Sequence, residues 1–271
     1  MPTRHSGFPA ASVRRLVLVR HGQTAWNATR RAQGHADIGL DETGHAQATA
    51  AAPYLAALRP ARLWTSDLSR ASQTAAYVAD LLGIPAEPDP RLREYSVGER
   101  SGLTRAQFSE RFPLEYAAWE RGDETVLVAG AESTDDVLGR MVPALREMLG
   151  SLAEGQTGMV VTHGACLRAA MLEVLGLGQS SDAAFATMGN CTWTTLQETE
   201  FGGGLRLAGY NVGVAHAVGV GPASSAGGQS PDDESAVGES ADDEAGDEEA
   251  PEGAPLHTRA AGGVDGARGA E

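Results

Sequence analysis

The sequence predicts an α/β fold in three layers, with helices on both faces of a mostly parallel central sheet. Short runs typical of strands alternate along the chain with segments of helical periodicity, which is the pattern of parallel strands joined by crossover helices. The runs at 14–19 and 158–163 are nearly all apolar, as strands covered on both faces are. No internal repeat is visible, so one domain accounts for the pattern.

Each element is predicted from a local signal. The predicted strands are 14–19, 61–66, 158–163, 192–198 and 205–210. The Phe-Gly-Gly-Gly sequence at 201–204 predicts a hairpin loop between the last two strands. Apolar side chains at helical spacing predict helices over 68–82, 137–152 and 165–176. Gly83 ends the first helix, and Pro143 predicts a kink in the second.

The acidity of the chain is concentrated in its C-terminal part. From Ala217 onward there are thirteen Asp and Glu and two Arg, a net charge of −11 out of −15 for the whole chain. This part has almost no large apolar residues, so burial cannot offset the entropy of ordering it. We therefore predict a flexible N-terminus (1–13), a catalytic domain (14–212) and an acidic disordered tail (213–271). A plain solvated tail is favoured over an acidic interaction tail.

The composition excludes several kinds of chemistry. All 21 basic residues are Arg, so Schiff-base and P-loop lysine mechanisms are absent. Cys166 and Cys191 form neither a disulfide framework nor a Cys-x-x-Cys metal pair, which suits a reducing cytosol. No signal peptide or membrane-spanning run is visible, and an acidic chain without a basic stripe is not expected to bind nucleic acid. We expect a cytoplasmic protein that acts on a small phosphorylated substrate, for the following reasons.

Arginines and histidines follow three of the predicted strands. Arg20 and His21 follow the first strand, Arg70 lies about one turn into the helix after the second, and His163 and Gly164 follow the third. Because the carboxyl ends of parallel strands share one edge of the sheet, these residues are expected to converge. Arg binds phosphate through a planar fork of donors, and an imidazole can accept a phosphoryl group. The pattern predicts a phosphoryl-transfer site that requires no metal or other cofactor.

Taken singly, these residues have ordinary alternatives. A lone histidine is more often a surface or packing residue, and that is the expectation for His35 and the remaining histidines. Arginines at helix starts can equally be exposed charges. The joint placement at strand ends is what favours a site.

Several motifs together resemble the histidine phosphatase superfamily, in the branch that includes the cofactor-dependent phosphoglycerate mutases. The stretch LVLVRHGQTAWN at 16–27 is similar to the Arg-His-Gly signature of that superfamily. Further matches follow in order as LDETGHAQA (40–48), SDLSRASQTA (66–75), LREYSVGERSGLT (92–104), GAES (130–133) and VVTHGACLRA (160–169). The resemblance covers about residues 14–212 and implies a phosphoglycerate-mutase-like fold.

The resemblance also implies roles for individual residues. His21 would be the nucleophile that becomes phosphorylated, His163 would stabilise the transferring phosphoryl group, and Glu94 would give a proton to the leaving oxygen. The residues expected to bind the substrate are Arg20, Asn27, Arg70 and Gly164. Without the resemblance, Glu94 could equally be a surface acid, because Glu99 lies in the same stretch.

Two features favour a phosphatase over a mutase. Only 38 residues separate Glu94 from Glu132, where the mutases carry a longer insertion. The stretches MGNCTWTTL (188–196) and LRLAGYN (205–211) are similar to bacterial glucosyl-3-phosphoglycerate phosphatases. We predict a phosphomonoesterase, with a cofactor-dependent phosphoglycerate mutase and a non-catalytic binding module of the same fold as alternatives. One departure is Ala131, where the family commonly has Gly.

Substrate choice is expected to depend on the segments 28–40 and 100–130. Four arginines in or near the second segment could bind a second anionic group or be solvated helix charges. They are Arg100, Arg105, Arg111 and Arg121.

Overall fold

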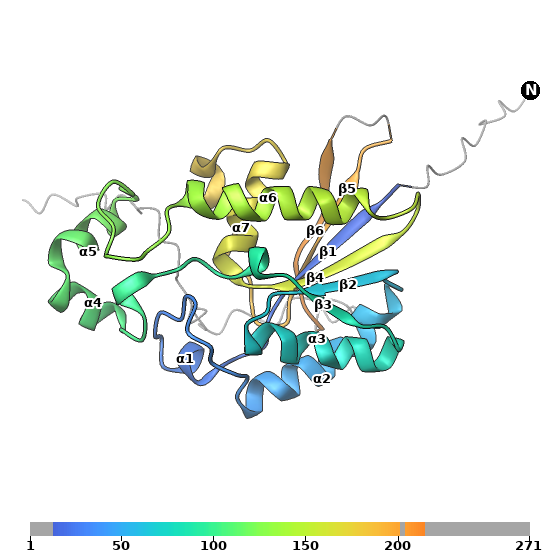
Figure 1. Ribbon diagram of the computed structural model, residues 1–271, viewed down its shortest axis with the longest axis horizontal. Coiled ribbons are helices and arrows are strands. Elements are labelled where there is room, and N and C mark those ends of the chain that lie inside the picture. Colours follow the sequence, from blue (N-terminus) through green and yellow to red (C-terminus); the bar gives the residue numbers. More distant parts are fainter. Residues whose placement is uncertain (1–12, 201–203, 215–271) are drawn as a thin grey trace, which may run out of the picture. The chain divides into compact units, whose positions relative to one another are not determined.

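A single mixed sheet organises the part of the chain that the computed structural model describes, residues 13–200 and 204–214. Its strands run in the order β3-β2-β4-β1-β5-β6 (Figure 1). They are β1 (Arg15–Arg20), β2 (Arg62–Thr65), β3 (Ala86–Pro88), β4 (Thr157–Thr162), β5 (Trp193–Glu198) and β6 (Leu205–Val212). Strand β4 pairs in parallel with β1 and β2, and β2 with β3, whereas β5 is antiparallel to β1 and to β6. The prediction of a mostly parallel sheet is confirmed.

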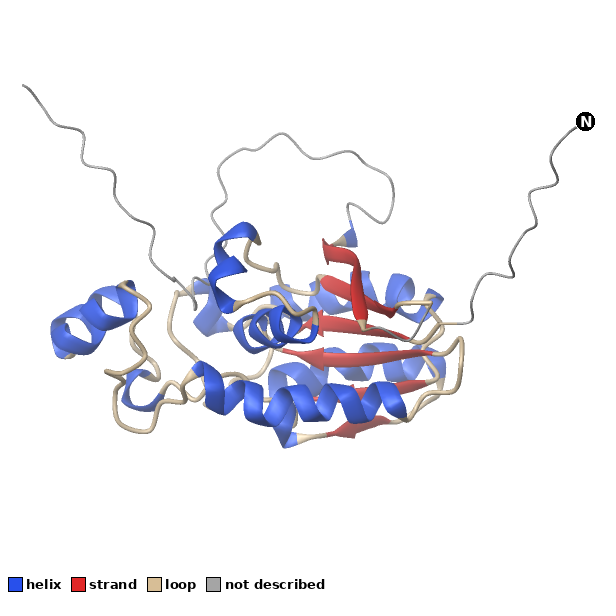
Figure 2. Ribbon diagram, turned by 90° about the horizontal axis from the view of Figure 1, so that it is seen from above, coloured by secondary structure: helices blue, strands red, loops and turns tan. Residues whose placement is uncertain are grey.

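Helices cover both faces of this sheet, as Figures 1 and 2 show. The helices are α1 (Ala25–Ala28), α2 (Glu42–Ala57), α3 (Ser69–Leu82), α4 (Arg105–Arg111), α5 (Pro113–Glu120), α6 (Thr134–Gly150) and α7 (Gly164–Val174). Helices α2 and α3 pack on one face, and α6 and α7 on the other, which confirms the three-layer arrangement. No helix within the described ranges has both the length and the apolar character needed to cross a bilayer.

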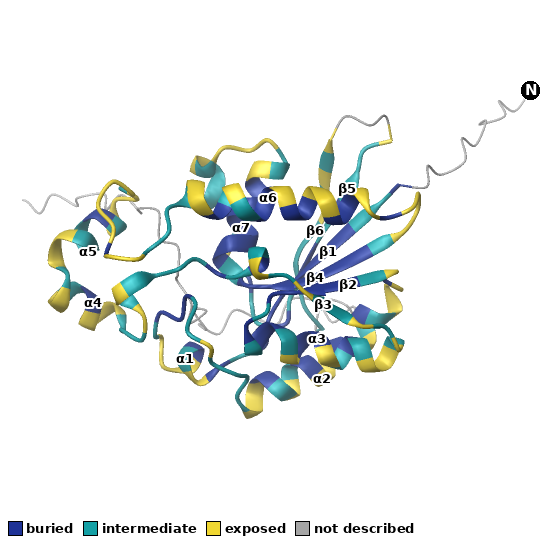
Figure 3. Ribbon diagram, viewed as in Figure 1, coloured by how far each residue is buried: buried dark blue, intermediate teal, exposed yellow. Residues whose placement is uncertain are grey.

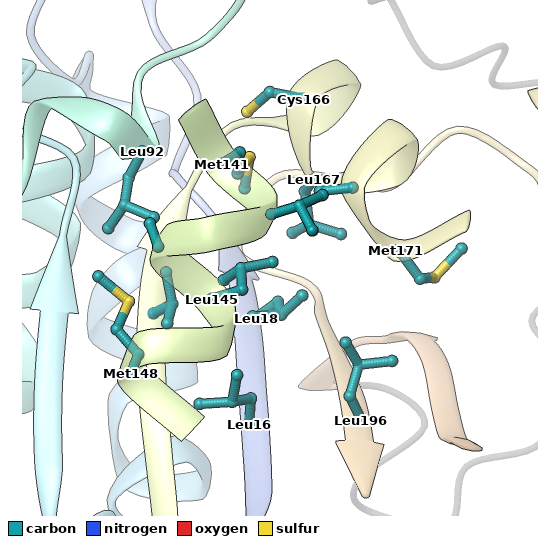
Figure 4. Close-up of a cluster of buried hydrophobic side chains, with 14 of the residues drawn as sticks. Leu16, Leu18, Leu92, Met141, Leu145, Met148, Cys166, Leu167, Met171 and Leu196 are labelled. Atoms are coloured by element: carbon teal, nitrogen blue, oxygen red, sulfur yellow. The ribbon is translucent and has the colours of Figure 1, made fainter. Parts of the chain in front are cut away.

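Alternate residues of β1 supply the core on the two faces. Leu16 and Leu18 face α6 and α7, and Val17 and Val19 face α2 and α3. All four are at most 1% exposed, and the central strands β1 and β4 are buried from their second residue onward (Figure 3). Figure 4 shows Leu16 and Leu18 beneath the α6 side chains. Full burial of such a side chain contributes about 1.5–3 kcal/mol, so this core holds the strand ends firmly in register.

The predicted helices are present, with ends set by their caps. Gly83 ends α3 in the left-handed conformation, at φ 64°. Ser133 begins α6 through a capping box with Asp136, and the helix continues through Pro143 to Gly150. Helix α7 occupies most of the predicted 165–176 segment.

Other elements were not predicted. The buried stripe of α2 consists mainly of Gly44, Ala48, Ala51 and Ala52, which are too small to stand out as an apolar pattern. Strand β3 has only three residues, and α4 and α5 are short. Residues 1–12, 201–203 and 215–271 lie outside the described part of the chain. The predicted flexible N-terminus, hairpin loop and acidic tail fall largely on them and stay predictions.

Candidate active site

The ends of β1, β2 and β4 bring the predicted histidines and arginines to one edge of the sheet. Arg20 is the last residue of β1 and pairs in register with Thr162, the last residue of β4. His21 and His163 each follow directly, so their rings lie side by side with centroids 5.1 Å apart in an edge-to-face arrangement. Arg70 joins them from the first turn of α3, which follows β2. The predicted convergence is present in the structure.

The His21 ring is held in one tautomer. Its Nδ1 lies 2.7 Å from the carbonyl oxygen of Gly22, and the residue is 3% exposed. Because a carbonyl can only accept, Nδ1 carries the proton and Nε2 carries the lone pair. Burial, followed by the charges of Arg70 and Arg20, holds the pKa of His21 well below its usual range. The ring is therefore a neutral imidazole with a nucleophilic Nε2.

Gly22 allows a close approach between β1 and α2. A Cβ at this position would lie 2.7 Å from the carbonyl oxygen of Gly44, in the first turn of α2. The start of α2 is itself capped by Asp41, whose carboxylate accepts from the Gly44 N–H at 2.8 Å. Only glycine fits beside His21 without displacing this helix.

The guanidinium of Arg70 is fixed by three acceptors. Its Nε donates to Nδ1 of His163 at 3.1 Å, Nη1 to the carbonyl of Ala36 at 2.8 Å, and Nη2 to the carbonyl of Gly34 at 2.7 Å. Arg70 is 1% exposed. Three of its five N–H groups thus hold the guanidinium plane in place, so binding an anion needs no further ordering of this side chain.

His163 links Arg70 to the end of β2. Since its Nδ1 accepts from Arg70, its proton is on Nε2, which lies 2.9 Å from the hydroxyl of Ser66. Burial and then Arg70 hold the pKa of His163 well below its usual range, so the ring is neutral. In this geometry His163 orients Arg70. A direct contact with a phosphoryl oxygen requires the Nε2–H to leave Ser66.

Arg20 and Gly164 lie against each other. Nη1 of Arg20 donates to the carbonyl of Met188, and Arg20 is 3% exposed. A Cβ at Gly164 would lie 3.2 Å from Nε and 3.3 Å from Cδ of Arg20. The structure thus gives Gly164 a steric part in the site, because it leaves room for the Arg20 side chain. Its predicted contact with substrate stays a prediction.

Asn27 belongs to a buried polar network at α1. Thr24 N donates to the Asn27 side-chain oxygen at 3.0 Å, and Asn27 N donates to the Thr24 hydroxyl at 3.1 Å. The same hydroxyl lies 3.0 Å from Oε1 of Gln33. Asn27 and Gln33 are each 2% exposed. Nothing in the sequence pattern singled out Gln33, because it lies in a segment without periodicity.

Glu94 is buried at the N-terminus of α7, next to His163. Its Oε1 accepts from Tyr95 N at 3.0 Å and from Cys166 N at 2.8 Å, and its Oε2 accepts from Ala165 N at 3.1 Å. The residue is 3% exposed, which excludes the alternative of a surface acid. Helix N-termini attract carboxylates, and here Glu94 caps a helix that lies about seventy residues further along the chain.

A second layer of polar groups holds the Glu94 backbone. Arg140 donates to the carbonyl of Glu94 at 2.8 Å and to both carboxylate oxygens of Glu132 at 2.9 Å. His35 Nε2 lies 2.8 Å from the same carbonyl, so this histidine supports the site. Burial tends to raise the pKa of Glu132, but Arg140 and the Ser96 N–H lower it overall. The carboxylate of Glu132 is therefore a fixed anion behind Glu94.

A cavity of about 470 Å³ opens beside Glu94. Tyr95 and Ala165, whose N–H groups bind the Glu94 carboxylate, are both part of its wall. Arg100 also lines the cavity, with its guanidinium 4.9 Å and 4.5 Å from the ring centres of Phe108 and Trp119. Two residues that bind the Glu94 carboxylate thus line this cavity, whereas Arg20, Arg70 and the two histidines do not.

Cationic side chains, not metal ligands, supply the positive charge of the site. Within the described residues there is no group of three or more His, Cys, Asp or Glu side chains placed to hold a metal ion. The site instead combines two buried arginines with two neutral imidazoles and a buried carboxyl group, an arrangement that can bind a phosphate and accept a phosphoryl group.

Residues 16–211 match the histidine phosphatase superfamily (branch 1), and the chain belongs to this superfamily of enzymes. A glucosyl-3-phosphoglycerate phosphatase of Mycobacterium tuberculosis (strain ATCC 25618 / H37Rv) is 38% identical over 190 residues, which cover 68% of this chain and 85% of the relative. A 2,3-bisphosphoglycerate-dependent phosphoglycerate mutase of Chelativorans sp. (strain BNC1) is 36% identical over 168 residues, 60% of this chain and 82% of the mutase. The predicted superfamily is confirmed.

A solved structure shows the same relationship. The mycobacterial glucosyl-3-phosphoglycerate phosphatase complexed with VO3 aligns with a TM-score of 0.66 and 36% identity, over 73% of this chain and 99% of that one. The phosphoglycerate-mutase-like fold is thereby shown, and the superfamily comprises both phosphatases and mutases.

Proposed function

We propose that this enzyme hydrolyses a phosphate monoester through a phosphohistidine on His21, and that its substrate is glucosyl-3-phosphoglycerate. The observation that carries the first part is the neutral His21 ring, whose Nδ1–H is bound to Gly22 and whose Nε2 is left as the nucleophile. A protonated imidazole could not attack phosphorus. The environment that keeps the ring neutral also contains the two arginines that would bind the phosphate.

The first step transfers the phosphoryl group to the enzyme. Nε2 of His21 forms a bond to phosphorus while the bond from phosphorus to the ester oxygen breaks. Arg70, already oriented by Gly34, Ala36 and His163, and Arg20, oriented by Met188, neutralise the charge on the phosphoryl oxygens. Removing one preorganised donor of this kind typically costs about 10²–10³ in turnover.

The leaving oxygen needs a proton, and Glu94 is the residue that would give it. Tyr95 and Ala165, whose N–H groups bind the Glu94 carboxylate, line the cavity, so we expect an alcohol held there to reach that carboxyl group with its ester oxygen. In the second step water attacks the phosphohistidine, Glu94 takes the proton of that water, and His21 is released with inorganic phosphate.

Two observations support the choice of substrate. The mycobacterial relatives named above are glucosyl-3-phosphoglycerate phosphatases, and the chain aligns with 85% of one of them. The cavity of about 470 Å³ falls in the range of small-molecule sites and is large enough for a sugar-glycerate group. Its wall contains aromatic rings and carboxylates, which can accept hydrogen bonds from the hydroxyls of a sugar, and one arginine, Arg100, which would bind the glycerate carboxylate.

The test measures inorganic phosphate released from glucosyl-3-phosphoglycerate, 3-phosphoglycerate, sugar phosphates and nucleotides. We expect glucosyl-3-phosphoglycerate to have the highest kcat/KM, and His21→Ala to abolish both turnover and labelling of the protein by a ³²P-substrate. Arg70→Gln should lower kcat/KM by about 10²-fold or more, whereas Arg62→Gln, which removes a surface pair with Glu87, serves as the matched control. Isomerised phosphoglycerate with little free phosphate would instead identify a mutase.

A further inference from the structure

We infer that Asn190 and Thr74 are positioning residues for the nucleophile, acting as a clamp on the peptide unit that joins His21 to Gly22. This inference rests on the proposed role of His21. The carbonyl oxygen of that peptide accepts from Nδ2 of Asn190 at 3.0 Å, and its N–H donates to the hydroxyl of Thr74 at 3.0 Å. Both ends of one peptide plane are thus held by side chains from distant parts of the chain.

This peptide plane controls the aim of the imidazole. The ring orientation depends on the bond between Nδ1 and the carbonyl of Gly22, the next carbonyl along the chain. Glycine has unusually soft backbone torsions, so the Gly22 carbonyl could rotate away if the preceding plane were free. The clamp removes that freedom, which keeps the Nδ1–H bond and directs Nε2 toward the phosphate site.

The turn that carries Asn190 also holds Arg20. The Cys191 N–H lies 3.1 Å from the carbonyl of Arg20 and 3.3 Å from that of His21. The carbonyl of Met188 accepts from the Arg20 guanidinium. Residues 188–191, which we call the nucleophile turn, therefore fix both the backbone of the nucleophile and a phosphate-binding side chain.

The nucleophile turn is itself strained and braced. Cys191 has a φ of 53°, a left-handed conformation that is unfavourable for a non-glycine residue and persists only where its surroundings enforce it. Asn211 supplies much of that bracing, since its side chain accepts from Gly189 N at 3.0 Å and donates to the Thr187 carbonyl at 3.2 Å. Strain held next to a nucleophile is consistent with a positioning role.

Thr74 completes the clamp from the opposite side. It lies one turn after Arg70 on α3 and is 2% exposed. Its hydroxyl donates its proton to the carbonyl of Arg70 at 2.7 Å, so the hydroxyl oxygen is the acceptor for the Gly22 N–H. The same helix therefore sets the position of the arginine and that of the nucleophile.

The experiment compares Thr74→Val with Thr74→Ser, and Asn190→Ala with Asn190→Asp, using p-nitrophenyl phosphate. Valine has the shape of threonine without the acceptor, whereas serine keeps it. We expect Thr74→Val and Asn190→Ala to lower kcat/KM by about ten- to a hundredfold. Thr74→Ser should retain most of the parent kcat/KM. Asn190→Asp should have a lower kcat/KM than Asn190→Ala, because it replaces a hydrogen-bond donor by an anion. The inhibition constant of inorganic phosphate should change by less than about twofold, since phosphate binding does not require an aimed imidazole.

Gln156→Ala is the matched control, because it removes a side-chain amide whose oxygen accepts from the backbone N–H of Ala153. Gln156 lies just before β4 begins, whereas His163 follows the other end of that strand. Its kcat/KM should equal that of the parent enzyme. Unchanged kcat/KM in Thr74→Val and Asn190→Ala, in a protein that His21→Ala inactivates, would overturn the clamp alone. A parallel loss of kcat/KM, phosphate affinity and melting temperature would also overturn it, as a general structural effect. Activity that survives His21→Ala would instead refute the proposed function.

Discussion

Glu94 has two physical roles in this structure, and the substitution Glu94→Gln separates them. As a carboxylate it caps α7 by accepting three backbone N–H groups, from Tyr95, Ala165 and Cys166. As an acid it would give the leaving group its proton. The carboxamide keeps the shape, retains one acceptor oxygen, and has no proton that it can give up.

The cost to stability follows from the hydrogen bonds. With the amide oxygen in the place of Oε1, the bonds from Tyr95 and Cys166 are kept, and the N–H of Ala165 faces an amide NH2 group. A buried donor left without an acceptor costs about 1–3 kcal/mol. Ala165 is 9% exposed, so its N–H has little access to bulk water. We expect the free energy of unfolding to fall by about 1–3 kcal/mol, measured by urea denaturation.

The cost to catalysis depends on the leaving group. General acid catalysis contributes about 10²–10⁴ for a poor leaving group such as an alkyl alcohol. A nitrophenolate leaves as an anion and needs no proton. Glu94→Gln should therefore lower kcat/KM by about 10²-fold or more for an alkyl phosphate, and by less than about tenfold for p-nitrophenyl phosphate.

The exposed Glu99, five residues further on, provides the control, because Glu99→Gln makes the same chemical change outside the site. It should alter neither stability nor either rate. An equal loss of kcat/KM on both substrates in Glu94→Gln would refute the acid role and leave Glu94 as a helix cap alone.

Two further predictions concern titration and helix stability. Because the pKa values of His21 and His163 are lowered, their ring ¹⁵N shifts should stay those of neutral imidazole from pH 8 to about 5.5; titration near 6.5 would contradict the burial argument. The unfolded chain binds these protons and the folded one does not, so stability should fall as pH drops below about 6.5. Gly139→Ala on α6, where a Cβ meets nothing within 4 Å, should stabilise by about 0.5–1 kcal/mol; a lower urea midpoint would disprove this.

The sheet and the convergence of its strand ends were predictable because both depend on local patterns. A buried strand such as β1 is visible as an apolar run, and the residues that follow parallel strands must share an edge. Arg20, His21 and His163 could therefore be placed together from spacing alone. Helix α2 escaped prediction because alanines form its buried face, and alanine gives little hydrophobic contrast.

The contacts that orient the site were not predictable, since they join segments far apart in the chain. Glu94 meets α7 across 71 and 72 residues, and Asn190 meets His21 across 169. Such polar residues lie in turns without periodicity, so nothing local distinguishes them from solvated side chains. The family resemblance supplied Glu94, but it did not supply the helix cap or the clamp.

The segment 28–40 shows how a prediction about function changes once these contacts are known. We expected it to govern substrate choice together with 100–130, yet the described residues that line the cavity all lie between Tyr95 and Asp182. The carbonyls of Gly34 and Ala36 instead hold Arg70, and Asp37 anchors this loop to α3 by accepting from the backbone N–H of Ser69 at 2.6 Å. We expect its part in the reaction to be to keep a guanidinium rigid, because a charge that must first be oriented stabilises a transition state less than one already in place. Substitutions here should therefore impair all substrates alike, whereas those around the cavity should discriminate among leaving groups.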